Sequence, residues 1–311
     1  MSILVHLADF AGLPVAVFAP ASEPAPAVLA APAEHAWYVG TDYDEDPDFA
    51  ELWARFRGQV DTTAVTALVI GYWGPPDEKN TTEVVKLLVE AAPAFPALRA
   101  LFLGDIVMEE SDISWIGHGD LAPLLGAYPG LERLEVRGSP EVVVEPLRSE
   151  GLRTLRFESG GLPGEAVRAV TGGDLPNLRR LEMWLGTETY GGDSTVADLA
   201  PLLSGERFPA LRHLGLQNSE NQDEIAEAVA GAAVVAQLET LNLGMGTLSD
   251  RGAEALLSGQ PLTHLKKLDL RHHFLSDAMM ERLRTSLDGV EVLLDEKQES
   301  DGGWFYIEVS E

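Results

Sequence analysis

Few residues in this 311-residue sequence have the types and spacing that a catalytic or metal site requires. The densest acidic run, from Asp42 to Asp48, is similar to a calcium loop in charge. It lacks the central glycine, however, and Trp53 stands where the glutamate of such a loop would be. We interpret the run as a solvated turn before a helix N-terminus, where negative charge is favourable. The one histidine cluster, His272-His273, has adjacent side chains that point apart on a strand, which favours a turn or surface role over a metal site.

The sequence lacks the common motifs of cofactor and nucleophile chemistry. It has no cysteine, no phosphate-binding loop, no complete G-x-G-x-x-G, no H-E-x-x-H and no G-x-S-x-G. With 50 aspartates and glutamates, no single carboxylate pair stands out as an acid/base couple. We therefore predict no catalytic residue, no cofactor, no metal and no enzyme activity.

Charge restricts the class of partner. The chain has 22 lysines and arginines against 50 acidic residues, a net charge of −28. Because phosphate groups require a basic surface, we predict no nucleic acid and no membrane as partner, and expect an unidentified protein or peptide. The N-terminus lacks the charged start of a secretory signal, and the absence of cysteine suits a reducing compartment, so we expect a cytoplasmic protein.

A repeated L-x-x-L-x-L pattern must position whatever site the protein has. The copies begin at Leu98, Leu131, Leu152, Leu178, Leu211, Leu238 and Leu265, with a weaker copy at Val65 and a doubtful one near Val290. The mean step is about 28 residues, and helical patterns follow several copies. Each unit is too small to bury its own apolar face, so the units must stack. The sequence predicts an α/β leucine-rich-repeat solenoid, or horseshoe, with a parallel inner sheet, outer helices and short non-repeat caps.

The repeat resembles a known type. The segment from Leu248 to Leu257, followed by His264 to Leu270, is similar to ribonuclease-inhibitor-like leucine-rich repeats. More narrowly, the layout resembles stand-alone bacterial cytosolic repeat proteins, whose genes tend to lie beside ATP-grasp and radical-enzyme genes. The asparagine or cysteine that many such repeats carry after the strand is replaced here, for example by Ser219 and His273. The turn backbone must therefore be bonded in another way.

We predict three parts. Residues 1–64 form an N-terminal cap, with strands at Leu13–Phe18 and Trp37–Thr41 and a short helix over Pro47–Arg57. Residues 65–287 form the solenoid of about eight repeats. Residues 288–311 form a C-terminal β-hairpin cap around the Ser300–Gly303 turn.

Alternation along each strand assigns side chains to the concave face of the sheet. The triplets on this face contain six cations and four acids, which sum to +2 in a chain of −28. Two interpretations remain open: the charges pair with each other on neighbouring strands, or they form an arginine-rich surface with tryptophan anchors. The candidate protein-binding residues are Trp73, Phe102, Arg133, Arg137, Arg156, Arg180, Trp184, His213, Lys267 and Arg271.

The sequence therefore favours a non-catalytic protein-binding or scaffold module that uses the concave face. One alternative is an accessory subunit of an enzyme system, presenting a peptide or small-molecule substrate. A third interpretation is a carboxylate-based hydrolase.

Overall fold

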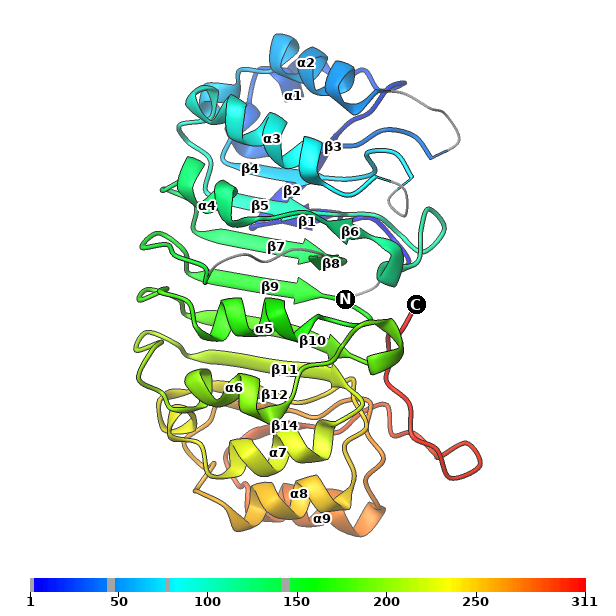
Figure 1. Ribbon diagram of the computed structural model, residues 1–311, viewed down its shortest axis with the longest axis vertical. Coiled ribbons are helices and arrows are strands. Elements are labelled where there is room, and N and C mark those ends of the chain that lie inside the picture. The colour runs from blue at the N-terminus through cyan, green and yellow to red at the C-terminus, as the bar shows by residue number, and fades with distance from the viewer. Residues whose placement is uncertain (1–2, 44–47, 76–78, 141–145) are drawn as a thin grey trace. The chain divides into compact units, whose positions relative to one another are not determined.

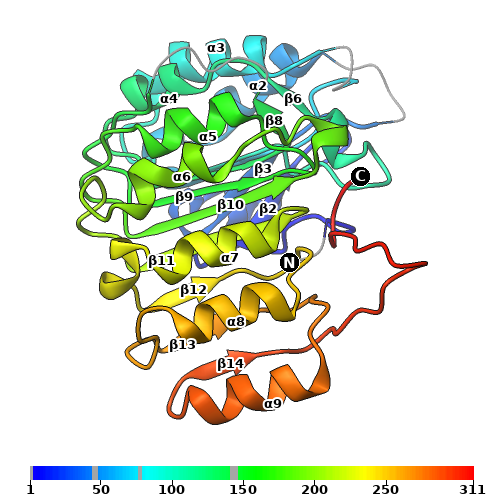
Figure 2. The ribbon, with the colours of Figure 1, turned by 60° about the horizontal axis from the view of Figure 1, so that its bottom comes forward.

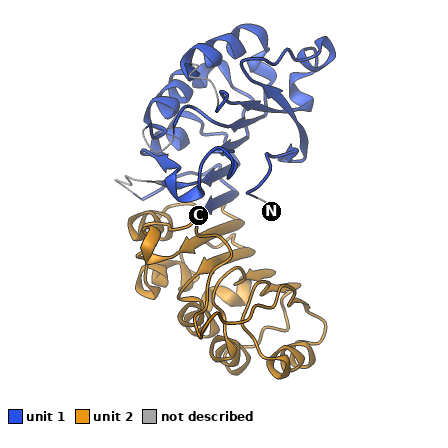
Figure 3. Ribbon diagram, turned by 90° about the vertical axis from the view of Figure 1, so that its right-hand side faces the viewer, with its two compact units in different colours: residues 1–158, 311 blue, residues 159–310 orange. Residues whose placement is uncertain are grey.

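A computed structural model describes residues 3–43, 48–75, 79–140 and 146–311 (Figure 1). Most of the acidic run, Asp44 to Asp46, lies outside the described residues. The chain divides into two compact units, which we call unit 1 (residues 1–158, with 311) and unit 2 (residues 159–310) (Figure 3).

Unit 1 is built on a sheet whose strands follow chain order. All neighbouring strands are parallel except the first pair, which is antiparallel. The strands are β1 (Asp9–Phe10), β2 (Leu13–Phe18), β3 (Ala36–Val39), β4 (Ala67–Ile70), β5 (Ala100–Leu103), β7 (Arg133–Arg137) and β9 (Thr154–Glu158). Two short strands, β6 (Gly117–His118) and β8 (Ser139–Pro140), pair separately. The helices are α1 (Pro26–Leu29), α2 (Phe49–Gln59), α3 (Thr82–Ala91) and α4 (Ala122–Ala127).

Unit 2 repeats one strand–turn–helix unit with regular register. Its strands are β10 (Arg180–Gly186), β11 (His213–Ser219), β12 (Thr240–Asn242), β13 (Lys267–Asp269) and β14 (Glu291–Leu293), all parallel. Its helices are α5 (Gly164–Thr171), α6 (Val196–Leu203), α7 (Gln222–Ala230), α8 (Asp250–Ser258) and α9 (Asp277–Ser286). Figure 2 shows α6 to α9 along one side of this sheet.

The repeated leucines form the core of this architecture. The leucines at the second position of the pattern align across the strands, as in the row Leu181, Leu214, Leu241 and Leu268, and each is at most 1% exposed. Side-chain caps start the helices: Ser249 accepts from the Arg251 N–H, and Ser276 accepts from the Met279 N–H. The predicted α/β fold with parallel strands and flanking helices is confirmed.

The two ends differ in how they continue the sheet. Strand β2 has the predicted bounds, β3 overlaps the predicted strand Trp37–Thr41, and both extend the parallel sheet. Pro47, the predicted start of the next helix, lies outside the described residues, and α2 begins at Phe49. At the other end, β14 pairs in parallel with β13 instead of forming a hairpin with residues 304–309. The predicted glycine turn forms locally, because Asp301 and Trp304 exchange two backbone hydrogen bonds. The residues after it return along the turns of unit 2.

These turns share a left-handed residue. Asn218, Met245 and His272 have φ values of 55°, 68° and 55°, and each stands two residues after the last core leucine of its repeat. The backbone is bonded by different side chains from turn to turn. Gln222 donates to the Leu216 carbonyl at 2.9 Å, and buried His273 accepts from the Leu275 N–H through Nδ1 and donates through Nε2 to the Leu294 carbonyl. Burial lowers the pKa of His273, which suits this neutral role.

Candidate functional site

The side of each sheet opposite the helices, which we call the helix-free face, carries the predicted binding residues that lie on strands. Trp73 instead lies in the turn after β4, beside the first turn of α3. In unit 1 this face is covered by the chain's own N-terminal segment. Phe10 is 3% exposed and meets Phe102 edge to face, with ring centroids 5.8 Å apart. The two rings belong to an apolar cluster with Ala36, Tyr38, Ala67, Val69 and Ala100, and Leu7 and Leu13 pack against it. Phe102 is therefore a core residue of unit 1 and does not reach the surface.

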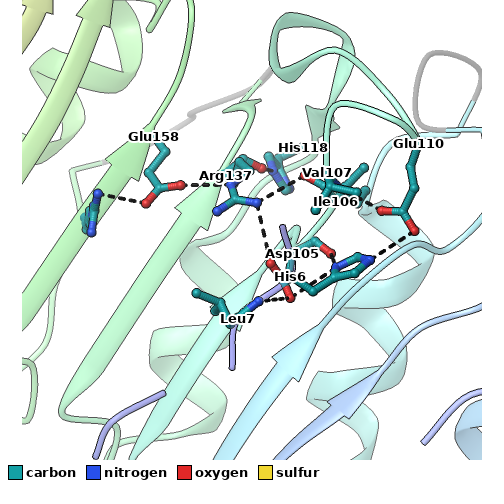
Figure 4. A network of polar contacts seen from close by, with 10 residues as sticks. His6, Leu7, Asp105, Ile106, Val107, Glu110, His118, Arg137 and Glu158 are labelled. Carbon is teal, nitrogen blue, oxygen red and sulfur yellow. Dashed lines mark hydrogen bonds and ion pairs between the residues drawn. The ribbon is translucent and has the colours of Figure 1, made fainter. Parts of the chain in front are cut away.

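A buried polar network lies beside this cluster (Figure 4). The guanidinium of Arg137 donates through Nε to Glu158 at 2.8 Å and through Nη1 to the Ile106 carbonyl at 3.2 Å. The same Nη1 lies 3.5 Å from Asp105 Oδ1. Arg137, Asp105 and Glu158 are each fully buried, and an isolated charge at this depth would be strongly destabilising. Arg156 also pairs with Glu158, at 2.9 Å.

His6 joins the N-terminal segment to this network. Its Nδ1 lies 3.1 Å from the Asp105 carbonyl and 3.4 Å from Asp105 Oδ2, and its Nε2 lies 3.5 Å from Glu110. The hydrogen bond to Asp105 is the largest cause, and the hydrogen bond to Glu110 the second, of a rise in the pKa of His6 to about 10. His6 is therefore a cation at neutral pH, and the N-terminal segment is held by both apolar packing and charge.

A second histidine nearby has the opposite character. His118 is fully buried, and its Nε2 lies 2.7 Å from the Arg137 carbonyl. Burial lowers the pKa of His118 to about 4, so its ring is neutral. The ring of Trp73 lies 5.7 Å from His118, and its indole donates to the Lys79 carbonyl at 2.7 Å. Trp73 is buried, and its polar atom is used within unit 1.

The helix-free face of unit 2 carries charge pairs along its strands. Arg180 pairs with Glu182 at 2.6 Å, and Arg271 pairs with Asp269 at 2.8 Å. Lys267 lies 3.8 Å from the same Asp269. These partners are two residues apart on one strand, where side chains share a face and stand about 7 Å apart. In unit 2 these pairs therefore run along the strands. In unit 1, Arg137 on β7 pairs with Glu158, its register partner on β9, so the predicted pairing between neighbouring strands also occurs.

The two members of these pairs differ in depth. The side chain of Arg180 is 47% exposed and that of Arg271 is 44% exposed, whereas those of Glu182 and Asp269 are 10% and 5% exposed. The carboxylates thus lie at the base, and the cations extend into solvent. His213 stands beside Arg180 in the register, and burial, with the Arg180 charge, lowers its pKa. This surface presents cations although the chain as a whole is strongly acidic.

The structure separates the ten predicted residues into groups. Trp73, Phe102, Arg133, Arg137 and Arg156 belong to unit 1, and Arg180, Trp184, His213, Lys267 and Arg271 belong to unit 2. Four of them are buried, namely Trp73, Phe102, Arg137 and Trp184. In unit 1, Arg133 is partly exposed, pairs with Glu135 at 2.6 Å and lies over the Phe10 ring.

Sequence reasoning missed His6, Phe10 and Asp105. Asp105 follows Gly104 directly after the apolar strand β5, which is an unusual place for a buried carboxylate. This position could have predicted the network, since a buried carboxylate requires a cation nearby. Within the described ranges, no three His, Asp or Glu side chains are grouped as metal ligands. None of the helices in the described part of the chain is long and apolar enough to cross a bilayer.

Among comparisons with known proteins, one solved structure is similar to this chain over most of its length. No protein-family model matches the sequence, and no curated protein matches it. The crystal structure of a Bacteroides fragilis protein, determined by a structural genomics consortium, is 31% identical with a TM-score of 0.80; the match covers 92% of this chain and 80% of that one.

Two more distant structures also match. An internalin from Listeria monocytogenes is 14% identical, with a TM-score of 0.42 over 87% of this chain and 71% of that one. A leucine-rich-repeat protein from Leptospira interrogans is 16% identical, with a TM-score of 0.36 over 88% and 58%. With TM-scores this low, neither likeness bears on the fold or function of this chain. At 31% identity over most of both chains, the protein belongs to the same family as the Bacteroides fragilis protein.

Proposed function

We propose that the protein is a non-catalytic leucine-rich-repeat module of the bacterial cytoplasm that binds another protein through the helix-free face of unit 2. The observation that carries this proposal is the difference in depth within the charge pairs. Arg180, Lys267 and Arg271 reach solvent, while the carboxylates that hold them, Glu182 and Asp269, are buried.

This arrangement supports recognition because it lowers the entropy lost on binding. A free arginine loses rotamer freedom when it contacts a partner, whereas one already held by a carboxylate loses less. The guanidinium of Arg271 uses Nε and one terminal nitrogen on Asp269, and nearly half of its side chain is exposed. A guanidinium has five N–H donors, so it can keep its internal partner and still donate to a ligand.

The partner chemistry follows from the exposed groups. Cationic tips above buried carboxylates suit a protein segment with acidic side chains or free backbone carbonyls. The net charge of −28 opposes long phosphate polymers, so a nucleic acid is a poor partner for the same arginines. In unit 1, the N-terminal segment already covers the apolar part of the equivalent face, so we assign the binding surface to unit 2.

Matched double variants test the proposal. Arg180→Ala with Arg271→Ala removes two cations from the helix-free face. Arg251→Ala with Arg282→Ala removes two cations from the helices of the same unit. Arg251 on α8 pairs with Glu224, and Arg282 on α9 pairs with Glu254. A partner is identified by affinity purification from the native host, and its affinity for both variants is measured by calorimetry.

We expect the face variant to weaken binding by about tenfold or more, which is about 1.4 kcal/mol. The helix variant should change affinity by less than about threefold, because exposed ion pairs contribute little. If the helix variant loses as much affinity as the face variant while both remain folded, the proposed surface is incorrect.

A further inference from the structure

A second surface of unit 2 lies at its C-terminal end. Three consecutive aromatic residues, Trp304, Phe305 and Tyr306, follow the Gly302-Gly303 turn, and all three are exposed. Trp304 is 80% exposed, although tryptophan is among the side chains that gain most from burial. We call Trp304, Phe305 and Tyr306, together with Phe274, the aromatic platform.

The platform is held in place from both sides. The turn before it is fixed by two backbone hydrogen bonds between Asp301 and Trp304, at 3.0 and 2.9 Å, and both of its glycines have left-handed φ values. The segment after it is fixed where the Glu308 N–H donates to the Met245 carbonyl and where the Asn218 side chain bonds both backbone groups of Val309. The aromatic residues between these anchors are exposed without being on a free chain end.

The rings of Phe305 and Tyr306 are also ordered by their own contacts. Phe305 stacks on Phe274 with centroids 4.2 Å apart, and Tyr306 meets the same ring edge to face at 5.3 Å. The Tyr306 hydroxyl donates to the Gln298 side chain at 2.9 Å. Rings that are rigid before binding lose little entropy on contact, which is the property of aromatic hot spots at protein interfaces.

The charges around the platform determine what it can bind. Residues 295–310 contain five acids and one lysine, and all five acids are exposed: Asp295, Glu296, Glu299, Asp301 and Glu308. The lysine, Lys297, is paired with Asp277 at 2.7 Å. An aromatic face attracts cations through its π electrons, most strongly for tryptophan, and the surrounding carboxylates add to that attraction.

From these observations, we propose that the aromatic platform and its acidic rim form a docking site for a lysine- or arginine-rich segment of a partner protein. A second copy of this chain is a poor occupant, since each copy carries −28. An anionic membrane is repelled by the same five acids. Glu296 and Glu308 of the rim lie close enough to Arg271 to act on its charge, so the two proposed surfaces adjoin. The platform takes a partner segment of opposite charge to the one proposed for the cationic face.

The probe is a random dodecapeptide phage library, panned on the full-length protein and counter-selected on the variant Trp304→Ser with Phe305→Ser. Both side chains are exposed, so the variant should keep the parent's far-UV circular dichroism and melting temperature. Trp115→Ser is the matched control, because Trp115 is another highly exposed tryptophan, at 58%, and lies in unit 1.

We expect the selected peptides to be enriched in lysine and arginine. Synthetic copies should bind the parent and Trp115→Ser equally, and should bind the platform variant about tenfold more weakly. Glu299→Gln with Asp301→Asn should also weaken binding, and added salt should reduce it further. Failure to enrich peptides, enrichment of peptides without basic residues, or equal binding to the platform variant would each overturn the proposal.

Discussion

The contact between Phe10 and Phe102 holds the N-terminal segment on unit 1, and Phe10→Ala tests how strongly. Phe10 is 3% exposed, so the substitution removes an almost completely buried ring. A buried phenylalanine replaced by alanine costs about 3–5 kcal/mol in protein cores. The edge-to-face contact with Phe102 and the Arg133 guanidinium 5.1 Å from the Phe10 centroid are both included in that loss.

We expect the lower end of that range, about 3 kcal/mol. The segment lies on an outer face of the sheet, so water can enter the space that the ring leaves, which limits the cavity term. This free energy corresponds to about a hundredfold change in the equilibrium between the attached and detached segment. The His6 contacts with Asp105 and Glu110 remain in the variant, so detachment should be partial at neutral pH.

Hydrogen exchange measured by mass spectrometry reports on this equilibrium directly. Peptides covering residues 7–13 and 100–105 should exchange faster in Phe10→Ala, while peptides from unit 2 should be unchanged. Val5→Ala is the control on the same segment, because Val5 is exposed and its truncation should change stability by less than about 0.5 kcal/mol. A loss below about 1 kcal/mol in Phe10→Ala, with amides protected as in the parent, would refute the view that this ring holds the segment.

Three further predictions concern charge and backbone. The pKa of His6 is raised in the fold, so its contribution to stability is complete below about pH 6.5 and is lost as pH rises toward about 10. Because 42% of the His6 side chain is exposed, urea denaturation should show the advantage of the parent over His6→Gln shrinking by only about 1 kcal/mol between neutral pH and about pH 10. Asn218→Gly keeps the left-handed backbone but removes both side-chain hydrogen bonds to Val309. Hydrogen exchange of residues 306–310 should therefore accelerate, by an amount equivalent to about 2 kcal/mol. Unchanged exchange would show that these bonds do not hold the segment. Gly138→Ala should lower the free energy of unfolding by about 3 kcal/mol, because Gly138 has a φ of 111° and a Cβ would lie 2.2 Å from the Ile116 carbonyl oxygen. The control is Gly126→Ala in α4, where a Cβ meets nothing within 4 Å, and it should be neutral or stabilising.

The repeats could be predicted from the sequence because their signal is local. Leu214, Leu241 and Leu268 recur at equal spacing, and burial on one side of a parallel sheet requires that pattern. Helix starts such as Ser249 and Ser276 could be found for the same reason, since a cap contacts only residues of its own first turn.

The candidate site was harder to predict because it depends on contacts between distant segments. Alternation correctly places Phe102 on the side opposite the helices, but it carries no information about a segment ninety-two residues earlier that covers it. Trp184 was also expected at the surface but is 1% exposed. Charge pairs such as Arg180 with Glu182 are separated by one residue, and so they were within reach of sequence reasoning.

The return of the C-terminal segment across the turns of unit 2 also bears on how this protein can evolve. Repeat proteins readily gain or lose whole units, because each unit contacts only its neighbours. Here residues 309, 308 and 306 form hydrogen bonds to Asn218, Met245 and His272, respectively. These three partners recur every 27 residues, one in each successive repeat. Duplication or deletion of one unit between Asn218 and His272 would displace at least one of these partners by about one strand spacing, 4.8 Å. The last repeats are therefore expected to be fixed in number, and length variation among relatives should fall outside this stretch.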